Sequence, residues 1–257
     1  MRAIITLALN THREAVRSKV LYGCLAVAFV LLGISSTFST VTVGDETRLV
    51  SDFGLALNSI VAVGFLVISG SRLLSQELTK RTIFNLLSRP ISRSTFVVGK
   101  FLGLLTTTLT IAFLLSLSLW LFVSLLSGTW QTILWYGFAM QILELSILCS
   151  LVLFFSSIVV TPALNGLFVF GAFLAGRSTP FLLAFTQDNE MPQYLRSAAA
   201  LLYGILPHLN DIYVANDIVY GHLPSFNFMA QAAFYAVAYT CAALSLACIF
   251  FKRRQFN

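Results

Sequence analysis

The chain has 257 residues, of which 58% are hydrophobic and only 10% charged, and its mean hydropathy is +0.87. Soluble domains carry about 25% charged residues, so this composition excludes a soluble protein and predicts an all-α integral membrane protein. The net charge of +6 does not indicate nucleic-acid binding, because the basic residues are divided among segments that adjoin apolar stretches. The 4 cysteines lie in apolar segments without the spacing of metal ligands, so we expect no metal site.

Residues 1–19 have the pattern of an amphipathic helix that lies on the membrane surface. Arg2, Arg13 and Arg17 share one arc of this helix with Thr6 and Asn10, and the opposite arc is apolar. The basic arc would attract anionic lipid headgroups. We therefore predict an interfacial elbow helix that binds membrane lipids.

Six apolar stretches have the length that crosses about 30 Å of hydrocarbon. We place these spans at residues 20–41, 53–74, 95–126, 132–160, 163–185 and 228–251. In the fifth, several glycines precede Arg177 and Pro180. We expect that helix to be short or broken near its outer end.

The distribution of charge orients these spans. Thirteen of the 16 basic residues fall in residues 1–19, in the segment 71–100 and in the tail after the last span, where they accompany only Glu14 and Glu77. The proposed outer segments hold the other three basic residues against seven acidic ones. The positive-inside rule therefore predicts six spans with both termini in the cytoplasm.

The basic loop at residues 75–94 contains a short stretch with two faces. As a helix, Leu78–Ser88 would place Arg81 and Asn85 on a polar arc and its apolar side chains on the opposite arc. Pro90 would end this helix. Such a helix is suited to lie between the membrane bundle and a soluble partner, and the alternative is a solvated loop that anchors the spans by its charge.

The outer loop at residues 186–227 is the longest polar region. Within it, Arg196–Leu206 is apolar enough to form a short helix that dips into the membrane, and Pro207 would end it. His208 and Asp211 follow and could bind a metal. A His-Asp pair at this spacing more often forms a hydrogen bond within a loop.

Glu144 is the only acidic residue deep inside a span, where a carboxylate is costly. Gln141 lies three residues earlier on the same helical face. The two side chains could line a polar substrate path, contact a headgroup, or bond across a helix interface. The alternative is a packing contact with a protonated or hydrogen-bonded carboxyl group.

Sequence signals for catalysis are missing. Val98-Gly99-Lys100-Phe101 contains a Gly-Lys pair but lacks the leading glycine and the Ser/Thr of a P-loop. The chain has no HExxH and no GxSxG motif. We therefore expect no catalytic residues and no ATP site in this chain.

Three sets of residues carry a resemblance to a known family. They are Asn10-Thr11-His12-Arg13-Glu14-Ala15-Val16-Arg17-Ser18-Lys19; the middle set Gln76-Glu77, Lys80-Arg81-Thr82, Leu86-Leu87-Ser88-Arg89-Pro90-Ile91-Ser92-Arg93 and Gly99-Lys100; and Leu206-Pro207-His208-Leu209-Asn210. With these motifs and its six-span plan, the chain resembles the permease subunits of ABC type-2 exporters. The resemblance is closest to the branch of permeases linked to multicopper-enzyme maturation.

The resemblance implies a permease in a bacterial inner membrane that pairs with a second copy or a paralogue. Each permease would dock on a separate ATP-binding subunit, which would hold ATP and Mg, through a coupling helix between the second and third spans. Re-entrant helices would lie between the fifth and sixth. The residues expected at the ATPase contact are Glu77, Lys80, Arg81, Asn85 and Arg89. A membrane scaffold and an intramembrane enzyme that uses Glu144 or His208 remain as alternatives.

Overall fold

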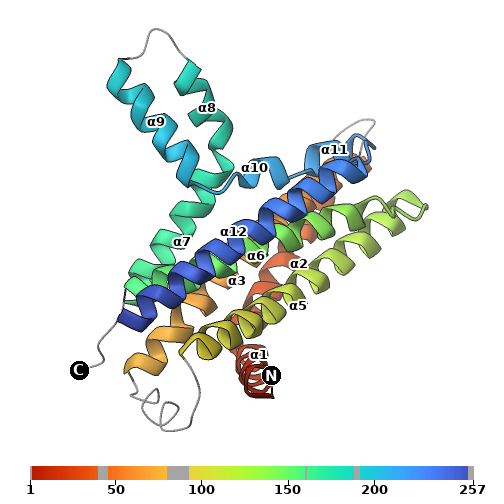
Figure 1. The fold of residues 1–257 in the computed structure, drawn as a ribbon. Helices are drawn as coiled ribbons and strands as arrows, with labels where there is room; N and C mark the ends of the chain where they lie inside the picture. The colour runs from red at the N-terminus through yellow and green to blue at the C-terminus, as the bar shows by residue number, and fades with distance from the viewer. Residues whose placement is uncertain (1, 40–45, 80–92, 160, 188–191, 254–257) are drawn as a thin grey trace.

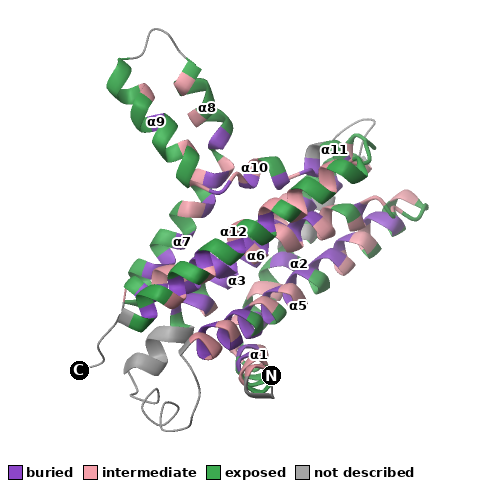
Figure 2. Ribbon diagram, in the orientation of Figure 1, coloured by how far each residue is buried: buried purple, intermediate pink, exposed green. Residues whose placement is uncertain are grey.

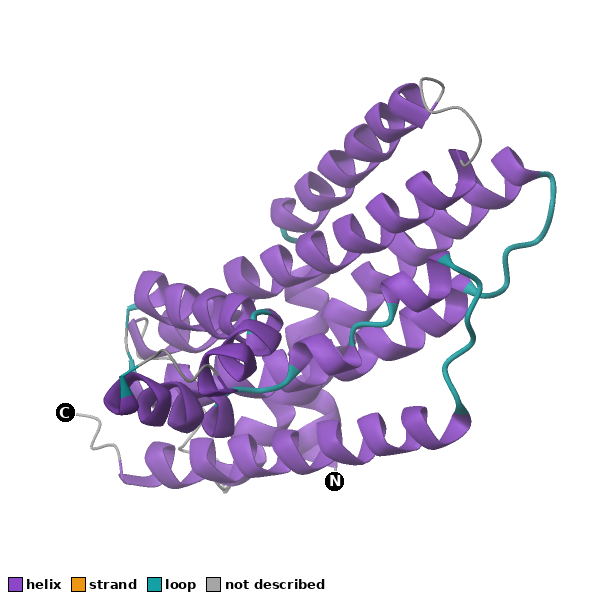
Figure 3. Ribbon diagram, turned by 90° about the horizontal axis from the view of Figure 1, so that it is seen from above, coloured by secondary structure: helices purple, strands orange, loops and turns teal. Residues whose placement is uncertain are grey.

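The computed structural model describes residues 2–39, 46–79, 93–159, 161–187 and 192–253, and it contains no strand within these ranges. The helices in chain order are α1 (Arg2–Val16), α2 (Lys19–Ser39), α3 (Glu46–Thr79), α5 (Arg93–Ser127), α6 (Leu134–Ile158), α7 (Pro162–Arg177), α8 (Thr179–Gln187), α9 (Gln193–Ile205), α10 (Leu209–Ile212), α11 (Ala215–Val219) and α12 (Phe226–Arg253). Figure 3 shows that helices make up nearly all of this part of the chain. The predicted all-α architecture is confirmed for it.

Helix α6 is the centre of the bundle. In its most apolar stretch 61% of the residues are buried, compared with 28% in α12, and α3, α5, α7 and α12 all contact it. Figure 2 shows the buried residues concentrated where α3, α5 and α6 face one another. The large side chains that are fully buried there include Leu66, Leu104, Leu119, Leu145, Ile147 and Leu148.

Four of the described helices, α3, α5, α6 and α12, are long and apolar enough to cross a membrane. α7 and α8 together form a fifth candidate that is bent by 58°. The protein is therefore a multi-pass membrane protein. α2 overlaps the predicted first span, but the apolar part that is described, Lys19–Val30, is shorter than one crossing. Six spans and cytoplasmic termini stay predictions.

The helices extend further than the sequence suggested. α3 begins at Glu46, within the segment before residue 53 that we expected to be an outer loop, and it continues to Thr79. The hydroxyl of Ser51 donates to the backbone oxygen of Thr47, so a polar residue near this end bonds to its own helix. The apolar stretch in the sequence shows only which part of a helix lies in hydrocarbon. The helix can continue into water, because its backbone groups bond to one another there as well.

The turn after α5 contains a glycine with a positive φ. Gly128 adopts a φ of +65°, which is strained for a residue with a Cβ atom. α7 begins with Pro162 at its first turn, where a missing backbone N–H costs no helical hydrogen bond.

The amino-terminal helix α1 packs across α5. In Figure 1 it is seen almost along its axis, while α5 runs across the view. A Cβ atom added at Gly99 would lie 2.7 Å from the Leu7 side chain, and one at Gly103 would lie 2.6 Å from Thr11. Two glycines four residues apart thus allow close helix contact. His12 Nδ1 also lies 3.2 Å from the Thr107 hydroxyl.

Arg13 and Arg17 are exposed beside this contact, and the side chain of Arg2 lies outside the described residues. The membrane-surface role of the three arginines stays a prediction. Among the residues expected at the ATPase contact, Lys80, Arg81, Asn85 and Arg89 lie in residues 80–92, outside the described ranges, and Glu77 is placed only by the backbone of α3.

Candidate functional site

The side chain of Glu144 lies inside the bundle, with 3% of its surface exposed. It projects from the middle of α6, the most enclosed helix of the described part. A carboxylate at such a position requires compensating contacts. The structure supplies them from two other helices, α7 and α3.

Arg177, the last residue of α7, forms an ion pair with Glu144. Arg177 Nε donates to Glu144 Oε1 at 3.0 Å and Nη2 donates to Oε2 at 3.0 Å. Ser59 of α3 joins the pair: Arg177 Nη2 lies 2.8 Å from its Oγ, which in turn lies 3.3 Å from Glu144 Oε2. Two parallel N–H···O bonds fix both the distance and the plane of the guanidinium group.

Aromatic rings enclose the guanidinium group. The Tyr213 ring centroid lies 3.6 Å from Arg177 Cζ, and the Phe173 ring centroid lies 5.5 Å from the same atom. These distances are those of cation-π contacts. Burial raises the pKa of the Tyr213 hydroxyl above its ordinary value, so this ring is neutral at physiological pH.

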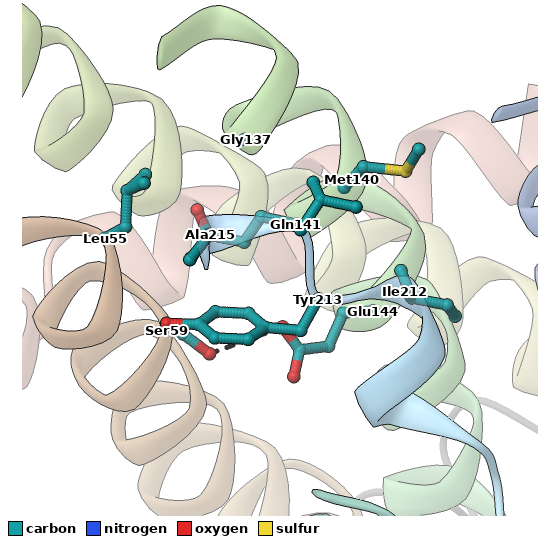
Figure 4. Close-up of a pocket in the computed structure, with 10 residues that line it drawn as sticks. Leu55, Ser59, Gly137, Met140, Gln141, Glu144, Ile212, Tyr213 and Ala215 are labelled. Atoms are coloured by element: carbon teal, nitrogen blue, oxygen red, sulfur yellow. Dashed lines mark hydrogen bonds between the residues drawn. The ribbon is translucent and has the colours of Figure 1, made fainter. Parts of the chain in front are cut away.

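A small cavity adjoins the ion pair. It encloses about 20 Å³ and is bounded on its polar side by Ser59, Gln141 and Glu144, with Tyr213 across it (Figure 4). Gln141 Nε2 is buried here and has no hydrogen-bond partner among the described residues. The volume is sufficient for one water molecule that could accept from this amide. This volume does not accommodate a guest much larger than a water molecule.

The bend after α7 is what brings Tyr213 over the ion pair. A Cβ atom at Gly176 would lie 2.6 Å from the Pro207 carbonyl oxygen and 2.9 Å from the Leu209 side chain, so glycine lets the segment that leads into α10 cross the end of α7. The Thr179 hydroxyl donates to the Gly176 carbonyl oxygen, for which the residue four positions later, Pro180, has no N–H to donate. The break that the glycines and Pro180 predicted therefore serves to assemble this site.

The sequence indicated Gln141 and Glu144, and the structure places both on the same cavity. It did not indicate Arg177, Ser59 or Tyr213. The available signal for the ion pair was the presence of one acidic and one basic residue in or near apolar spans. The two residues are 33 positions apart, however, and they meet only because α7 packs beside α6. Ser59 and Tyr213 carried no signal, since a serine and a tyrosine are common in any membrane helix or loop.

His208 and Asp211 do not converge on a common ligand. The backbone N–H of His208 donates to the Tyr235 hydroxyl at 3.0 Å, its Nδ1 lies 3.3 Å from the same oxygen, and Asp211 is exposed. Within the described ranges no group of three His, Cys, Asp or Glu side chains could hold a metal ion. The His208 contact fastens the start of α10 to α12.

A model of the ABC-2 family of transporter proteins matches residues 5–256, which is almost the whole chain. No curated protein matches the chain. The narrower resemblance to permeases of multicopper-enzyme maturation stays a prediction.

Proposed function

Because the chain belongs to the ABC-2 family of transporter proteins, we propose that this membrane component of an ABC transporter is an export permease driven by a separate ATP-binding subunit. The match over residues 5–256 is the observation that carries this proposal. The chain has no P-loop, so ATP and Mg would be bound by the partner subunit.

The contact with that subunit is assigned to the basic loop and to Glu77, Lys80, Arg81, Asn85 and Arg89. This loop connects α3 with α5, and α3 carries Ser59 of the ion-pair cluster. A displacement of the loop would therefore be applied directly to helices of the bundle core. We place the loop and both termini in the cytoplasm of a bacterial cell, with two permease copies or paralogues in the inner membrane.

The ion-pair cluster is proposed as the closed point of the substrate path. Glu144 and Gln141 face a cavity of about 20 Å³, and Tyr213 covers it from the segment between α10 and α11. Passage of a substrate requires that α7 or this segment moves away from α6. No observation favours a scaffold. No observation favours an intramembrane enzyme that uses Glu144 either, because Arg177 already engages this carboxylate.

Charge reversal in the basic loop tests the proposal. Arg81→Glu with Arg89→Glu should prevent co-purification of the permease with its coexpressed ABC ATP-binding subunit and abolish the stimulation of ATP hydrolysis. Removing one partner of a buried charge contact costs about 2–5 kcal/mol.

The matched control is Lys252→Glu with Arg253→Glu, which reverses two charges in the tail after the last span. This variant should insert and still bind the ATP-binding subunit. If the loop variant keeps both complex formation and ATP turnover, the basic loop is not the coupling element. If the wild-type chain neither binds nor stimulates the ATP-binding subunit, the permease assignment is wrong.

A further inference from the structure

A second recess lies far from the ion pair, where the beginning of α7 packs beside the end of α3. It is an open groove of about 670 Å³. Its apolar walls include Val67 and Ile68 of α3 and Leu167 and Phe170 of α7. Ala163 lies in the same groove near the first turn of α7. The ion pair is at the other end of α7. Arg177 lies about 16 Å along the helix axis from Gly166, which lines the groove, at about 1.5 Å per residue.

The groove opens on an exposed apolar surface of two helices. Ile68, Leu167 and Phe170 expose 42%, 62% and 43% of their surfaces, and both helices belong to candidate spans. An apolar recess on such a surface is filled by hydrocarbon rather than by water. Its walls are therefore suited to an acyl chain.

One end of the groove carries a positive charge. Arg72 lines it, is exposed, and is the last residue of the apolar span Thr47–Arg72. Ser71, which lies beside it, is buried, and its hydroxyl donates to the Ile68 carbonyl oxygen. A basic side chain at the boundary of a span lies at the level of the lipid headgroups and attracts those with a net negative charge.

We propose that this groove is a binding site for an anionic phospholipid of the cytoplasmic leaflet. One acyl chain lies between α3 and α7, and the phosphate group contacts Arg72. This site is separate from the proposed substrate path, and the assignment does not depend on coupling to ATP.

A second copy of the chain fits the groove less well than a lipid. In a contact related by a twofold axis along the membrane normal, the two Arg72 side chains would lie at the same depth in the bilayer, one on each side of the axis. Like charges at an interface oppose association, whereas an anionic headgroup neutralises the charge. A zwitterionic lipid would fill the same groove, but it has no net negative charge to neutralise that of Arg72.

Native mass spectrometry of the full chain in detergent measures this binding. Phosphatidylglycerol and phosphatidylcholine with identical acyl chains are the two probes, and we expect the wild type to retain phosphatidylglycerol preferentially. Arg72→Gln should lower the affinity for phosphatidylglycerol about fivefold, the loss of one headgroup charge contact, and lower that for phosphatidylcholine by a smaller factor, because its choline cation offsets the charge of the phosphate. Arg72→Lys should restore the preference.

A matched pair of tryptophan substitutions tests the groove itself. Ala163→Trp places an indole in the groove and should reduce the binding of either lipid about tenfold, as expected if about two methylene groups are displaced. Leu164→Trp changes the neighbouring exposed residue, which does not line the groove, and should bind as the wild type does. Elution volume and helix content establish that both variants are folded.

Three results would overturn the assignment. One is a wild type that binds both lipids equally, and another is identical lipid binding by the two tryptophan variants. The third is a loss of self-association by Ala163→Trp with unchanged lipid binding, which would assign the groove to a second copy of the chain. None of these results bears on whether the permease stimulates its ATP-binding subunit, so failure of this inference and failure of the proposed function are distinguishable.

Discussion

Leu148 on α6 is fully buried, whereas Leu201 on α9 exposes 62% of its surface, although both lie in apolar helices. The same contrast holds for the regions around them. The bundle encloses α6, while the α8–α9 hairpin projects away from it with Phe181, Tyr194 and Ile205 exposed (Figures 1 and 2). Lipid solvates apolar side chains, so apolarity alone does not separate a core from a surface in a membrane protein.

The two regions are also held together differently. In the bundle, Arg177 bonds to residues of α3 and α6, so three helices depend on one guanidinium group. The hairpin is fastened mainly near its base, where the Tyr239 hydroxyl of α12 donates to the Ile205 carbonyl oxygen at 3.1 Å. In this protein the directional polar contacts are concentrated in the bundle core rather than in the hairpin. Three substitutions, each with a control, measure the difference in stability between the two regions.

The largest expected effect comes from the ion pair. Arg177→Leu leaves the Glu144 carboxylate buried and unpaired, which should destabilise the chain by about 3–5 kcal/mol, as measured by denaturant titration in mixed micelles. Arg196→Leu is the matched control in the hairpin, because that arginine donates to a single backbone oxygen, that of Thr186. We expect it to change stability by less than about 1 kcal/mol.

The double variant Glu144→Leu with Arg177→Leu sharpens this test. Removing both charges should recover most of the lost stability, yet transport should remain impaired if the pair belongs to the substrate path. A double variant as unstable as Arg177→Leu alone would show that the arginine acts through its packing rather than its charge.

A smaller effect is expected from removing apolar volume. Leu148→Ala opens a cavity next to α6 and should cost about 2–5 kcal/mol. Leu201→Ala should alter stability by no more than about 0.5 kcal/mol, since its side chain already contacts solvent or lipid. Thermal unfolding of the two variants in the same detergent compares them, and equal losses would contradict the assignment of the core to the bundle.

The smallest of the three effects concerns the bend that joins the two regions. Gly176→Leu would force Pro207 and Leu209 away from the end of α7, at a cost of about 1–3 kcal/mol. Gly171→Leu is the matched control on the same helix, because a Cβ atom there meets nothing within 4 Å. Differential scanning fluorimetry should separate the two variants, and similar melting temperatures would show that the crossing at Gly176 does not need glycine.

Much of the fold could be predicted because hydrocarbon imposes a minimum length on each span. The apolar stretches predicted at 53–74, 95–126 and 228–251 lie in α3, α5 and α12, the stretch at 132–160 contains α6, and the broken fifth span corresponds to α7 with α8. The helix ends were less predictable, as α3 shows by beginning at Glu46, since hydropathy does not report where a helix stops in water.

Only part of the candidate site could be predicted. Glu144 was recognisable because an acid inside a span is costly wherever it points. Its partner was not, because Arg177 stands at the end of a span, where a basic residue is usually explained by the headgroups. The pairing needs the 58° bend between α7 and α8 together with the packing of α7 beside α6.

The sequence by itself determined that this is a helical membrane protein with a buried acid in its fourth predicted span, because composition and the cost of charge in hydrocarbon act on each segment separately. Tertiary structure alone decided that Arg177 and Ser59 meet Glu144, that the Tyr213 ring covers Arg177, and that Leu148 is enclosed while Leu201 is not. These outcomes depend on which helices lie side by side. In lipid, where apolar surfaces gain little by association, that choice depends on close approach at small residues such as Gly176 and on polar side chains that find partners only across helices.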